Sequence, residues 1–436
     1  MSNEALEQAL EVEAFLASCH VDGAVGSRWT RVAGGKGSGD TLYHGNAGVV
    51  LFYLELHRAT DEKRFLDIAV EGGRALVTSV EDAAKTSALS IAIYSGLPGY
   101  VFVLYELAKA SGQTEFRDAA VALVQRIGDQ AEPLGSGIGW IEPIPFSDIT
   151  GITGEREVLD LSIGAAGAGI GFLYAYRNGL HAQALDWATQ TADRLIEMSV
   201  DGEGGPNWLM MADMPFPFDA PNFAHGAAGV AYFLADLHRA TGEQRYLDVA
   251  IEAAGYVEAH TTASGDGHLV CHTDQNPGLY YLGVCHGPPG TGRLMYLLHE
   301  ITGDARWLEW LHANMAGLLA TGAPEARTRG LWNNFGQCCG DAGIGDYALF
   351  LHRATSDPSY LDLANRVAAV IADASTVDNG KRSWVQAEHR ERPDFVETQT
   401  GYMQGAAGIG SFLLHLATHD ADVIAKIPFP DMPFTR

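Results

Sequence analysis

The chain has 436 residues, of which 47% are hydrophobic, and its 54 acidic and 28 basic residues give a formal net charge of −26. So strong an acidic excess argues against nucleic acid or an anionic membrane as the main partner. No uncharged apolar run reaches the roughly eighteen residues that a transmembrane helix needs, so no membrane span is predicted.

The N-terminal segment, MSNEALEQALEVEAFLASCH, is acidic and amphipathic. It lacks the basic start and the apolar core of a signal peptide, so we do not expect secretion. Cysteines are few and odd in number, which is typical of a reducing compartment, where thiols bind metals or catalyse more often than they crosslink. We therefore expect a cytoplasmic protein. Its five cysteines are Cys19, Cys271, Cys285, Cys338 and Cys339.

A Gly-x-x-Gly motif followed by an apolar run recurs seven times, at intervals of 51 to 68 residues. A second motif of the type LHRATGEQRYLDVA follows most copies, as it does from Leu237. Each repeat therefore predicts two helices, the first apolar nearly all round and the second amphipathic. The first glycines of the seven motifs are Gly45, Gly96, Gly164, Gly226, Gly287, Gly340 and Gly405.

Seven consecutive helical hairpins form either an open solenoid or a closed ring. Inner helices that are apolar all round favour the closed ring, because an open solenoid would expose its ends. We therefore predict an all-α protein, an α/α toroid in which the inner helices begin at Gly-x-x-Gly. The whole chain, 1–436, is expected to be one domain, with repeats starting near residues 44, 95, 163, 225, 286, 339 and 404.

In such a toroid, the residues that precede each Gly-x-x-Gly converge on one mouth of the barrel. The fifth and sixth repeats place Cys285-His286 and Cys338-Cys339 there, side by side in the ring. Three soft ligands from neighbouring helix starts suit a tetrahedral Zn²⁺ with one open position, and helix N-termini favour the thiolate form. The alternatives are inert buried cysteines and a vicinal disulfide. Either Cys339 or His286 could complete the metal shell.

Other polar residues are expected at the same rim. His225, in the fourth repeat, is a candidate general acid or base or a hydrogen-bonded core histidine. Asp160, in an apolar stretch before the third motif, would orient a histidine, shuttle a proton or cap a helix. His44 lies farther around the ring and is predicted to be structural. The Cys271-His272 pair falls in a loop and is a weaker candidate for metal binding.

With these motifs in this order, the chain resembles the lanthionine synthetase C-like (LanC) cyclases over nearly its whole length. The resemblance implies an α/α toroid with zinc at the barrel mouth, and addition of a peptide cysteine thiol to dehydroalanine or dehydrobutyrine. The family's zinc cysteines fall on Cys285 and Cys338, and its histidine ligand falls on Cys339. The proton-handling histidine falls on His225 and the family aspartate falls on Asp160.

The chain departs from the family pattern at three positions. Cys339 replaces the histidine ligand, and the added thiolate charge on the metal should make a bound substrate thiolate more nucleophilic. His286 stands where a tyrosine is common, and it is expected to stabilise an enolate or assist proton transfer. Tyr281 occupies a position that often carries arginine.

The resemblance implies a zinc-dependent lanthipeptide cyclase that acts on a dehydrated precursor peptide. A separate dehydratase is expected, because the seven repeats leave no room for one. One alternative is a related protein that adds glutathione or another thiol to dehydrated residues, and another is a non-catalytic module that binds modified peptides. A toroidal carbohydrate enzyme would need a carboxylate pair, for which Asp160, Glu142 and Asp148 are available.

Overall fold

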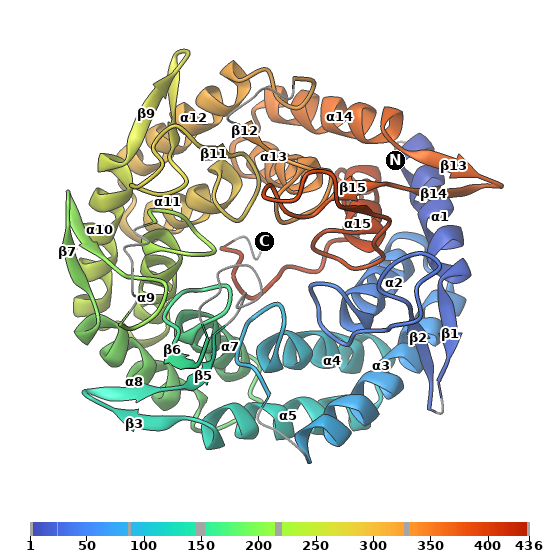
Figure 1. The fold of residues 1–436 in the computed structure, drawn as a ribbon, viewed down its shortest axis with the longest axis horizontal. Coiled ribbons are helices and arrows are strands. Elements are labelled where there is room, and N and C mark those ends of the chain that lie inside the picture. Colours follow the sequence, from blue (N-terminus) through green and yellow to red (C-terminus); the bar gives the residue numbers. More distant parts are fainter. Residues whose placement is uncertain are drawn as a thin grey trace.

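The helices of the chain alternate between an inner and an outer ring (Figure 1). The computed structural model describes residues 3–23, 25–85, 89–144, 153–213, 220–326 and 331–433. The inner helices are α2 (Asn46–Thr60), α4 (Leu97–Ser111), α7 (Ala165–Arg177), α9 (Ala227–Thr241), α11 (Pro288–Thr302), α13 (Asp341–Thr355) and α15 (Ala406–Ala417). The outer helices are α1 (Asn3–Ser18), α3 (Lys63–Ala84), α5 (Thr114–Asp129), α8 (Ala184–Glu197), α10 (Gln244–Ala259), α12 (Ala305–Ala320) and α14 (Pro358–Asp373).

The inner helices are buried on every side, as the apolar runs after Gly-x-x-Gly predict. In α15 every residue from Ala406 to Ala417 is buried. Each inner helix packs against the next one along the chain, and α15 returns to contact α2. The predicted α/α toroid is confirmed. Within the described residues, no helix combines the length and the apolar character that crossing a bilayer requires.

The seventh repeat differs from the prediction of seven consecutive hairpins. Residues 418–433, which follow α15, contain no helix. The N-terminal helix α1 packs against α15 instead and supplies its outer partner (Figure 1). Ala9, Val12 and Leu16 of α1 are fully buried in this contact region. The amphipathic N-terminal segment thus covers an apolar face that the C-terminal segment leaves open, and the ring closes through both ends of the chain.

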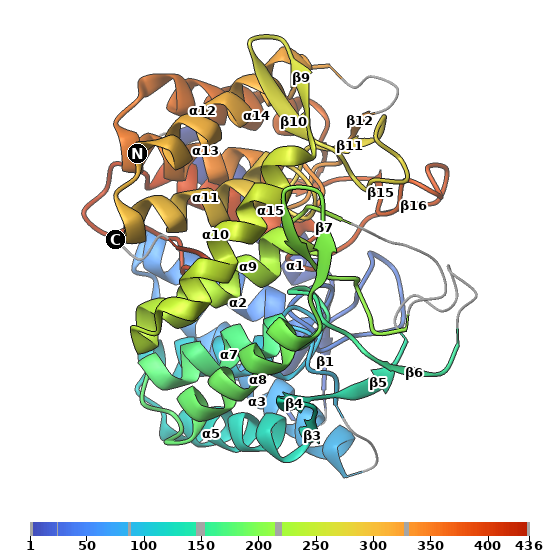
Figure 2. The same ribbon diagram turned by 90° about the vertical axis from the view of Figure 1, so that its left-hand side faces the viewer.

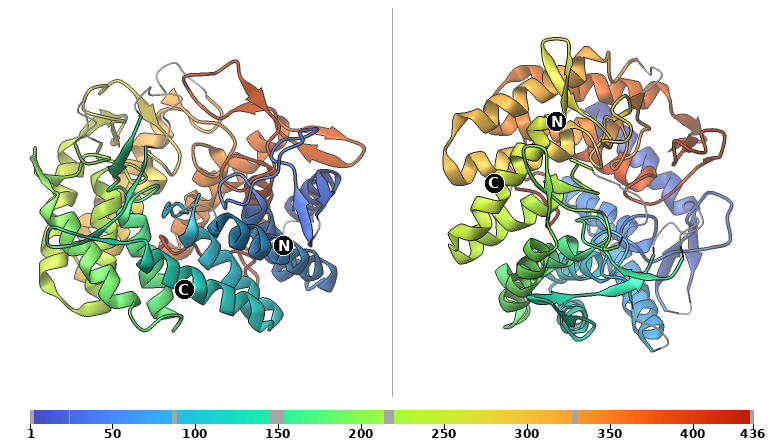
Figure 3. Two further views of the ribbon diagram at one scale, coloured as in Figure 1. Left: turned by 60° about the horizontal axis from the view of Figure 1, so that its bottom comes forward. Right: turned by 60° about the vertical axis from the view of Figure 1, so that its left-hand side comes forward.

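Short two-stranded sheets connect the outer helices to the next inner helix and gather at one end of the barrel (Figures 2 and 3). Three of these connections carry a buried tryptophan that donates its indole N–H to a carbonyl in the last turn of the preceding outer helix, as Trp140 does to Ile127. The antiparallel pairs are β1 (His20–Asp22) with β2 (Ser27–Trp29), β3 (Glu132–Leu134) with β4 (Gly137–Gly139), β5 (Ile141–Pro143) with β6 (Glu155–Glu157), β7 (Val200–Gly202) with β8 (Gly205–Asn207), β9 (Thr261–Ser264) with β10 (Gly267–Val270), β13 (Thr376–Asp378) with β14 (Lys381–Ser383), and β15 (Gln386–Ala387) with β16 (Val396–Glu397).

A closed circle of backbone hydrogen bonds runs around the mouth of the barrel. Each bond joins the segment before one Gly-x-x-Gly to the equivalent segment of the next repeat, and the seventh repeat donates back to the first. The circle joins the seven helix starts at one end of the barrel. Its bonds are Tyr43 N to Tyr94 O, Ile93 N to Ser162 O, Ser162 N to Ala224 O, Ala224 N to Cys285 O, Cys285 N to Cys338 O, Cys338 N to Met403 O and Met403 N to Tyr43 O, with N···O distances of 2.8–3.2 Å.

The C-terminal tail closes the other end of the barrel. It turns into the centre of the ring on the side away from the strands (Figures 1 and 2). Its Asp431 is fully buried and accepts hydrogen bonds from Tyr94 and, at 2.5 Å, from Arg293. Phe429 packs against the rings of Phe102 and Tyr402. The mouth is therefore the end from which a large substrate can approach the cysteines.

Candidate metal centre at the barrel mouth

Three cysteines meet at the mouth, as their positions in the repeats predict. The sulfur atoms of Cys285, Cys338 and Cys339 all lie within 4.8 Å of one another. The Sγ–Sγ distances are 3.4 Å from Cys285 to Cys339 and 3.6 Å from Cys338 to Cys339, and all three are free thiols. A disulfide needs sulfur atoms about 2.05 Å apart, so the pair 338–339 is not crosslinked.

A parallel pair of short strands sets the approach of the two cysteine segments. β11 (Tyr280–Tyr281) pairs with β12 (Leu331–Trp332), and these strands precede Cys285 and the Cys338-Cys339 pair respectively. The glycines of the sixth motif allow close packing below them. A Cβ at Gly343 would lie 2.1 Å from the Gln337 carbonyl oxygen and 3.0 Å from the Val284 side chain. The motif therefore needs glycine because neighbouring repeats approach within contact distance.

The donor set fits a soft or borderline metal ion. Cys285 and Cys339 are buried, Cys338 is partly exposed, and all three precede helix N-termini, whose partial positive charge favours thiolate. Hydrogen bonds from Cys285 and Cys339 hold the pKa of Cys338 well below its usual range. The pKa of Cys285 is raised, because its hydrogen bonds to the other two thiols and its burial favour the protonated form. A bound cation would displace the remaining protons.

His225 and Asp160 form a hydrogen-bonded pair on the same rim. Nδ1 of His225 lies 2.7 Å from Oδ2 of Asp160, and Oδ1 of Asp160 accepts from the backbone N–H of Ile163 at 2.8 Å. Burial disfavours a charge on His225, but the carboxylate outweighs burial and raises its pKa. Asp160 thus fixes the orientation of the His225 ring through Nδ1.

His286 is buried beside this pair but does not join the group of possible metal ligands. Its ring centroid lies 5.4 Å from that of His225 and 4.4 Å from that of His272. Neither ring nitrogen of His286 has a hydrogen-bond partner among the described residues. Burial, with the neighbouring histidines, holds its pKa well below the usual value, so the ring is neutral. Such an imidazole has both nitrogens available for a bound molecule.

Two aromatic residues that the sequence analysis named, His272 and Tyr281, lie closer to the cysteines and His286 than it expected. His272 was considered only as a possible ligand with Cys271, yet its ring stacks on His286 and lies 4.4 Å from the ring of Tyr281. Tyr281 packs against the cluster formed by Ala224, Cys285 and Cys339. Its sequence signal is its position four residues before Cys285. No local signal marks His272, because the loop after β10 carries it to the rim.

A profile of the "lanthionine synthetase C-like protein" family matches residues 38–432. The chain belongs to this family. Among solved structures, nisin cyclase is similar at 14% identity, with a TM-score of 0.62, covering 91% of this chain and 92% of that one. A D-mannose isomerase and a protein from Listeria innocua each match at 14% identity and a TM-score of 0.50, covering 94% of this chain and 96% of theirs. At identities this low, these structural similarities show that the fold is shared. No match was found among curated protein sequences.

Of the carboxylates considered for carbohydrate chemistry, the two that the structure describes, Asp160 and Glu142, are each engaged by hydrogen bonds in this LanC-like protein. Asp160 is engaged by His225. Glu142 accepts hydrogen bonds from the backbone N–H of Ile91, at 3.0 Å, and from Ser90, which fixes a loop. Asp148 lies outside the described residues. Nε2 of His44 lies 3.3 Å from a carboxylate oxygen of Glu388.

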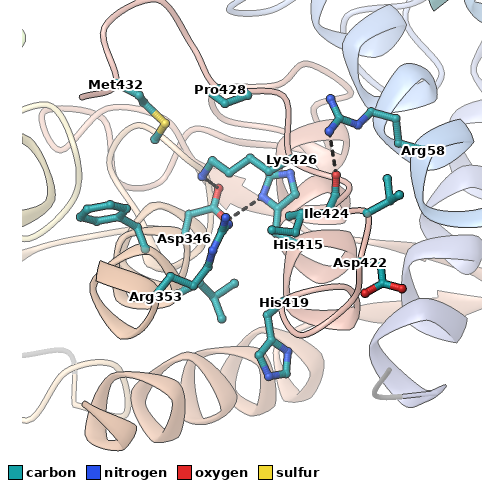
Figure 4. Close-up of a pocket in the computed structure, with 13 residues that line it drawn as sticks. Arg58, Asp346, Arg353, His415, His419, Asp422, Ile424, Lys426, Pro428 and Met432 are labelled. Carbon is teal, nitrogen blue, oxygen red and sulfur yellow. Dashed lines mark hydrogen bonds and ion pairs between the residues drawn. The ribbon is translucent and has the colours of Figure 1, made fainter. Parts of the chain in front are cut away.

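A cavity of about 520 Å³ in the LanC-like barrel lies beside the C-terminal tail (Figure 4). It is formed by α13, α15 and the C-terminal tail, and its polar lining includes Arg58, Arg353, His415 and Lys426. None of the predicted site residues lines it. The space between the cysteines and the tail is much narrower, about 30 Å³, which is room for about one water molecule.

Proposed function

We propose that this protein is a zinc-dependent lanthipeptide cyclase, which adds cysteine thiols of a precursor peptide to its dehydroalanine or dehydrobutyrine residues. The observation that carries the proposal is the group of three thiols at the mouth, with a histidine–aspartate pair on the same rim. Membership of the lanthionine synthetase C-like family supports it. Cys339 as the third ligand would make this the Cys-Cys-Gly variant.

Cys285, Cys338 and Cys339 would hold the metal and leave one position for the substrate. When bound, Zn²⁺ lowers the pKa of a thiol, so that the thiolate forms near neutral pH. Three thiolates from the protein give the site a net negative charge. This charge should weaken the bond between the metal and the substrate thiolate, so that the substrate sulfur attacks carbon more readily.

His225 is positioned to complete the addition. The substrate sulfur forms a bond to the β-carbon of the dehydro residue, and the electron pair of the broken π bond moves to the carbonyl, which gives an enolate. Protonated His225 donates its Nε2 proton to the α-carbon, and the proton lost by the substrate thiol restores it. Asp160 accepts from Nδ1–H and so keeps the ring oriented and charged.

His286 is suited to the enolate oxygen. Its ring is neutral and its nitrogens are unpartnered among the described residues, so it can donate one N–H without losing another hydrogen bond. A donor already in place at the position where negative charge develops lowers the barrier. His272 and Tyr281, whose rings also contact each other, pack against the ring of His286 and would hold it there.

The substrate in this proposal is a peptide that a separate dehydratase has already modified. We propose that residues 1–436 act as one domain, because the backbone circle couples all seven repeats to the site. A reducing compartment such as the cytoplasm would keep the thiols free.

The test is to measure zinc content and cyclisation for four proteins. We expect the wild type to hold one zinc ion and Cys285→Ala and Cys338→Ala to lose both zinc and activity. His225→Ala should keep zinc but lose about 10²–10⁴-fold in rate. Cyclisation leaves the peptide mass unchanged, so the loss of alkylatable thiols is followed. Full zinc in Cys285→Ala would refute the site.

The same assay separates the alternative functions. A protein that adds an external thiol would produce a peptide whose mass increases by that of glutathione when glutathione is supplied. A non-catalytic module would bind the dehydrated peptide while the number of free thiols stays constant. Loss of free thiols at constant mass supports the cyclase.

A further inference from the structure

The seventh repeat places a glutamine at the rim where other repeats carry His225, His286 or Cys339. Gln404 is 1% exposed, and its side chain reaches the sixth repeat and the first. Its Nε2 lies 3.4 Å from the sulfur of Cys339 and 2.9 Å from the hydroxyl of Tyr43. A buried amide with two N–H donors therefore faces a thiol and a phenol.

The orientation of this amide is determined by Asn334. Oδ1 of Asn334 accepts from the backbone N–H of Gly336 at 2.9 Å, and its Nδ2 donates to the Ala387 carbonyl at 3.3 Å. The same Nδ2 donates to Oε1 of Gln404 at 2.7 Å. Because Oε1 of Gln404 is the acceptor of that bond, its Nε2 must be the atom that faces Cys339.

Tyr43 fixes the second N–H of the same amide. Its hydroxyl oxygen accepts one N–H of Gln404, which leaves the other N–H for the sulfur of Cys339. The sulfur of Cys339 in turn lies 3.6 Å from that of Cys338. The amide of Gln404 is thus held by Asn334 on one side and Tyr43 on the other, with a donor directed at the thiol pair of the sixth repeat.

The need for such donors follows from the charge of the site. Three thiolates around a divalent cation leave one excess negative charge in a largely buried place. Hydrogen bonds to the sulfur atoms spread that charge and hold the ligands in position. A histidine ligand in place of Cys339 would be neutral, and its metal-bound nitrogen would have no lone pair left to accept an N–H.

We propose that Asn334, Gln404 and Tyr43 form a hydrogen-bonded network that holds Cys339, beside Cys338, as a thiolate ligand, with Gln404 as its positioning residue. The network matches the Cys-Cys-Gly form of the site and rests on the proposed function for the identity of the metal. Its N–H donors fix the position of the ligand sulfur and spread its negative charge. The network directs no donor at Cys285.

Zinc affinity, measured by competition with a chromogenic chelator, tests the network. Gln404→Met removes both N–H donors but keeps a side chain of similar length, and Tyr43→Phe removes the hydroxyl. We expect each to weaken zinc binding by about 10–100-fold, the range for lost hydrogen bonds to ligands. The control is Ser95→Ala, at the equivalent rim position of the second repeat. Ser95 is exposed, and its variant should bind zinc like the wild type.

Two further measurements separate the network from a general packing role. With Co²⁺ in place of zinc, the sulfur-to-metal absorption band of Gln404→Met should move to longer wavelength, because its sulfur electrons are no longer stabilised. In a Cys339→His background, where the thiolate is absent, Gln404→Met should change zinc affinity by no more than about twofold.

Three results would overturn the proposal. The first is a Gln404→Met affinity within about twofold of the wild type, and the second is an equal loss in both backgrounds, which would indicate a packing defect. The third is a wild type that binds neither zinc nor Co²⁺. That third result would also refute the proposed function, whereas the first two leave it standing.

Discussion

At the scale of single residues, a buried ion network ties the C-terminal tail to the barrel. His415 lies 2.7 Å from Asp346 and 3.1 Å from Glu55, and Lys426 of the tail lies 3.0 Å from Asp346 (Figure 4). The backbone N–H of Ile427 donates to Glu55 at 2.9 Å. These groups belong to α2, α13, α15 and the tail, so the network joins elements at both ends of the sequence.

This network predicts a pH-dependent stability. Burial opposes the charge of His415, but Asp346 and Glu55 outweigh burial and raise its pKa. A raised pKa contributes stability that is present below about pH 6.5 and lost as pH rises through the folded-state value. His415→Gln should therefore cost about 3–5 kcal/mol at pH 6 and less at pH 9.

Urea unfolding of the wild type and the variant at both pH values measures the difference. The pKa of Asp346 is lowered, because the charges of His415 and Lys426 outweigh the effect of its burial. Asp346 therefore stays charged from pH 6 to pH 9, and its titration does not contribute to the difference between the two pH values. A cost that is the same at pH 6 and pH 9 would contradict the assignment of a charged His415.

At the scale of elements, the Gly-x-x-Gly motif is a packing device that places each helix start against its neighbour. In the fifth motif, a Cβ at Gly290 would lie 2.0 Å from the Val284 carbonyl oxygen and 2.7 Å from the Phe223 side chain of the fourth repeat. The segments before α11 and α13 carry the cysteines, so this packing sets the distance between the thiols.

Gly290→Ala is therefore predicted to destabilise the protein and to disturb the metal centre. Because the nearest atoms belong to the backbone, the extra methyl group forces a shift, at a cost of about 1–3 kcal/mol. Zinc affinity should fall with it. The matched control is Gly278→Ala, five positions upstream of Gly283 in the approach to the site, where an added Cβ meets nothing within 4 Å. Thermal unfolding and zinc titration measure both, and equal behaviour of the two variants would contradict the packing role.

At the scale of the whole molecule, the ring is closed by the two ends of the chain. α1 covers the outer face of α15, and the seventh repeat in turn hydrogen-bonds to the first at the mouth. Closure therefore couples residues that are roughly 400 positions apart in the sequence, and the barrel has no exposed terminal repeat of the kind that an open solenoid must cap.

Leu16→Ala tests this closure. Leu16 is fully buried on α1, and truncating a buried leucine costs about 2–5 kcal/mol. Because α15 follows directly after Gln404, loosening α1 should also weaken zinc binding at the distant mouth. Glu7→Ala, on the exposed face of α1, is the control. Chemical denaturation and zinc titration provide the readouts, and a Leu16→Ala protein as stable as the wild type would show that α1 is dispensable for closure.

The sequence by itself determined the repeat, the toroid and the meeting of Cys285 with Cys338 and Cys339, because all three follow from local periodicity repeated seven times. It also indicated His225 and Asp160 as candidates, although not their 2.7 Å contact.

Only the tertiary structure decided which residues complete the rim. That α1 replaces the missing outer helix depends on a contact between the two ends of the chain, which no local pattern records. The position of Gln404 before Gly405 marks it as a rim residue, but its contact with Cys339 comes from a neighbouring repeat, and the contact of His272 with Tyr281 and His286 depends on the path of the loop after β10. The structure also set His286 apart from the thiol cluster, because its ring packs against His225, His272 and Tyr281. Local sequence determines where each repeat begins, whereas contacts between repeats determine what its first residues touch.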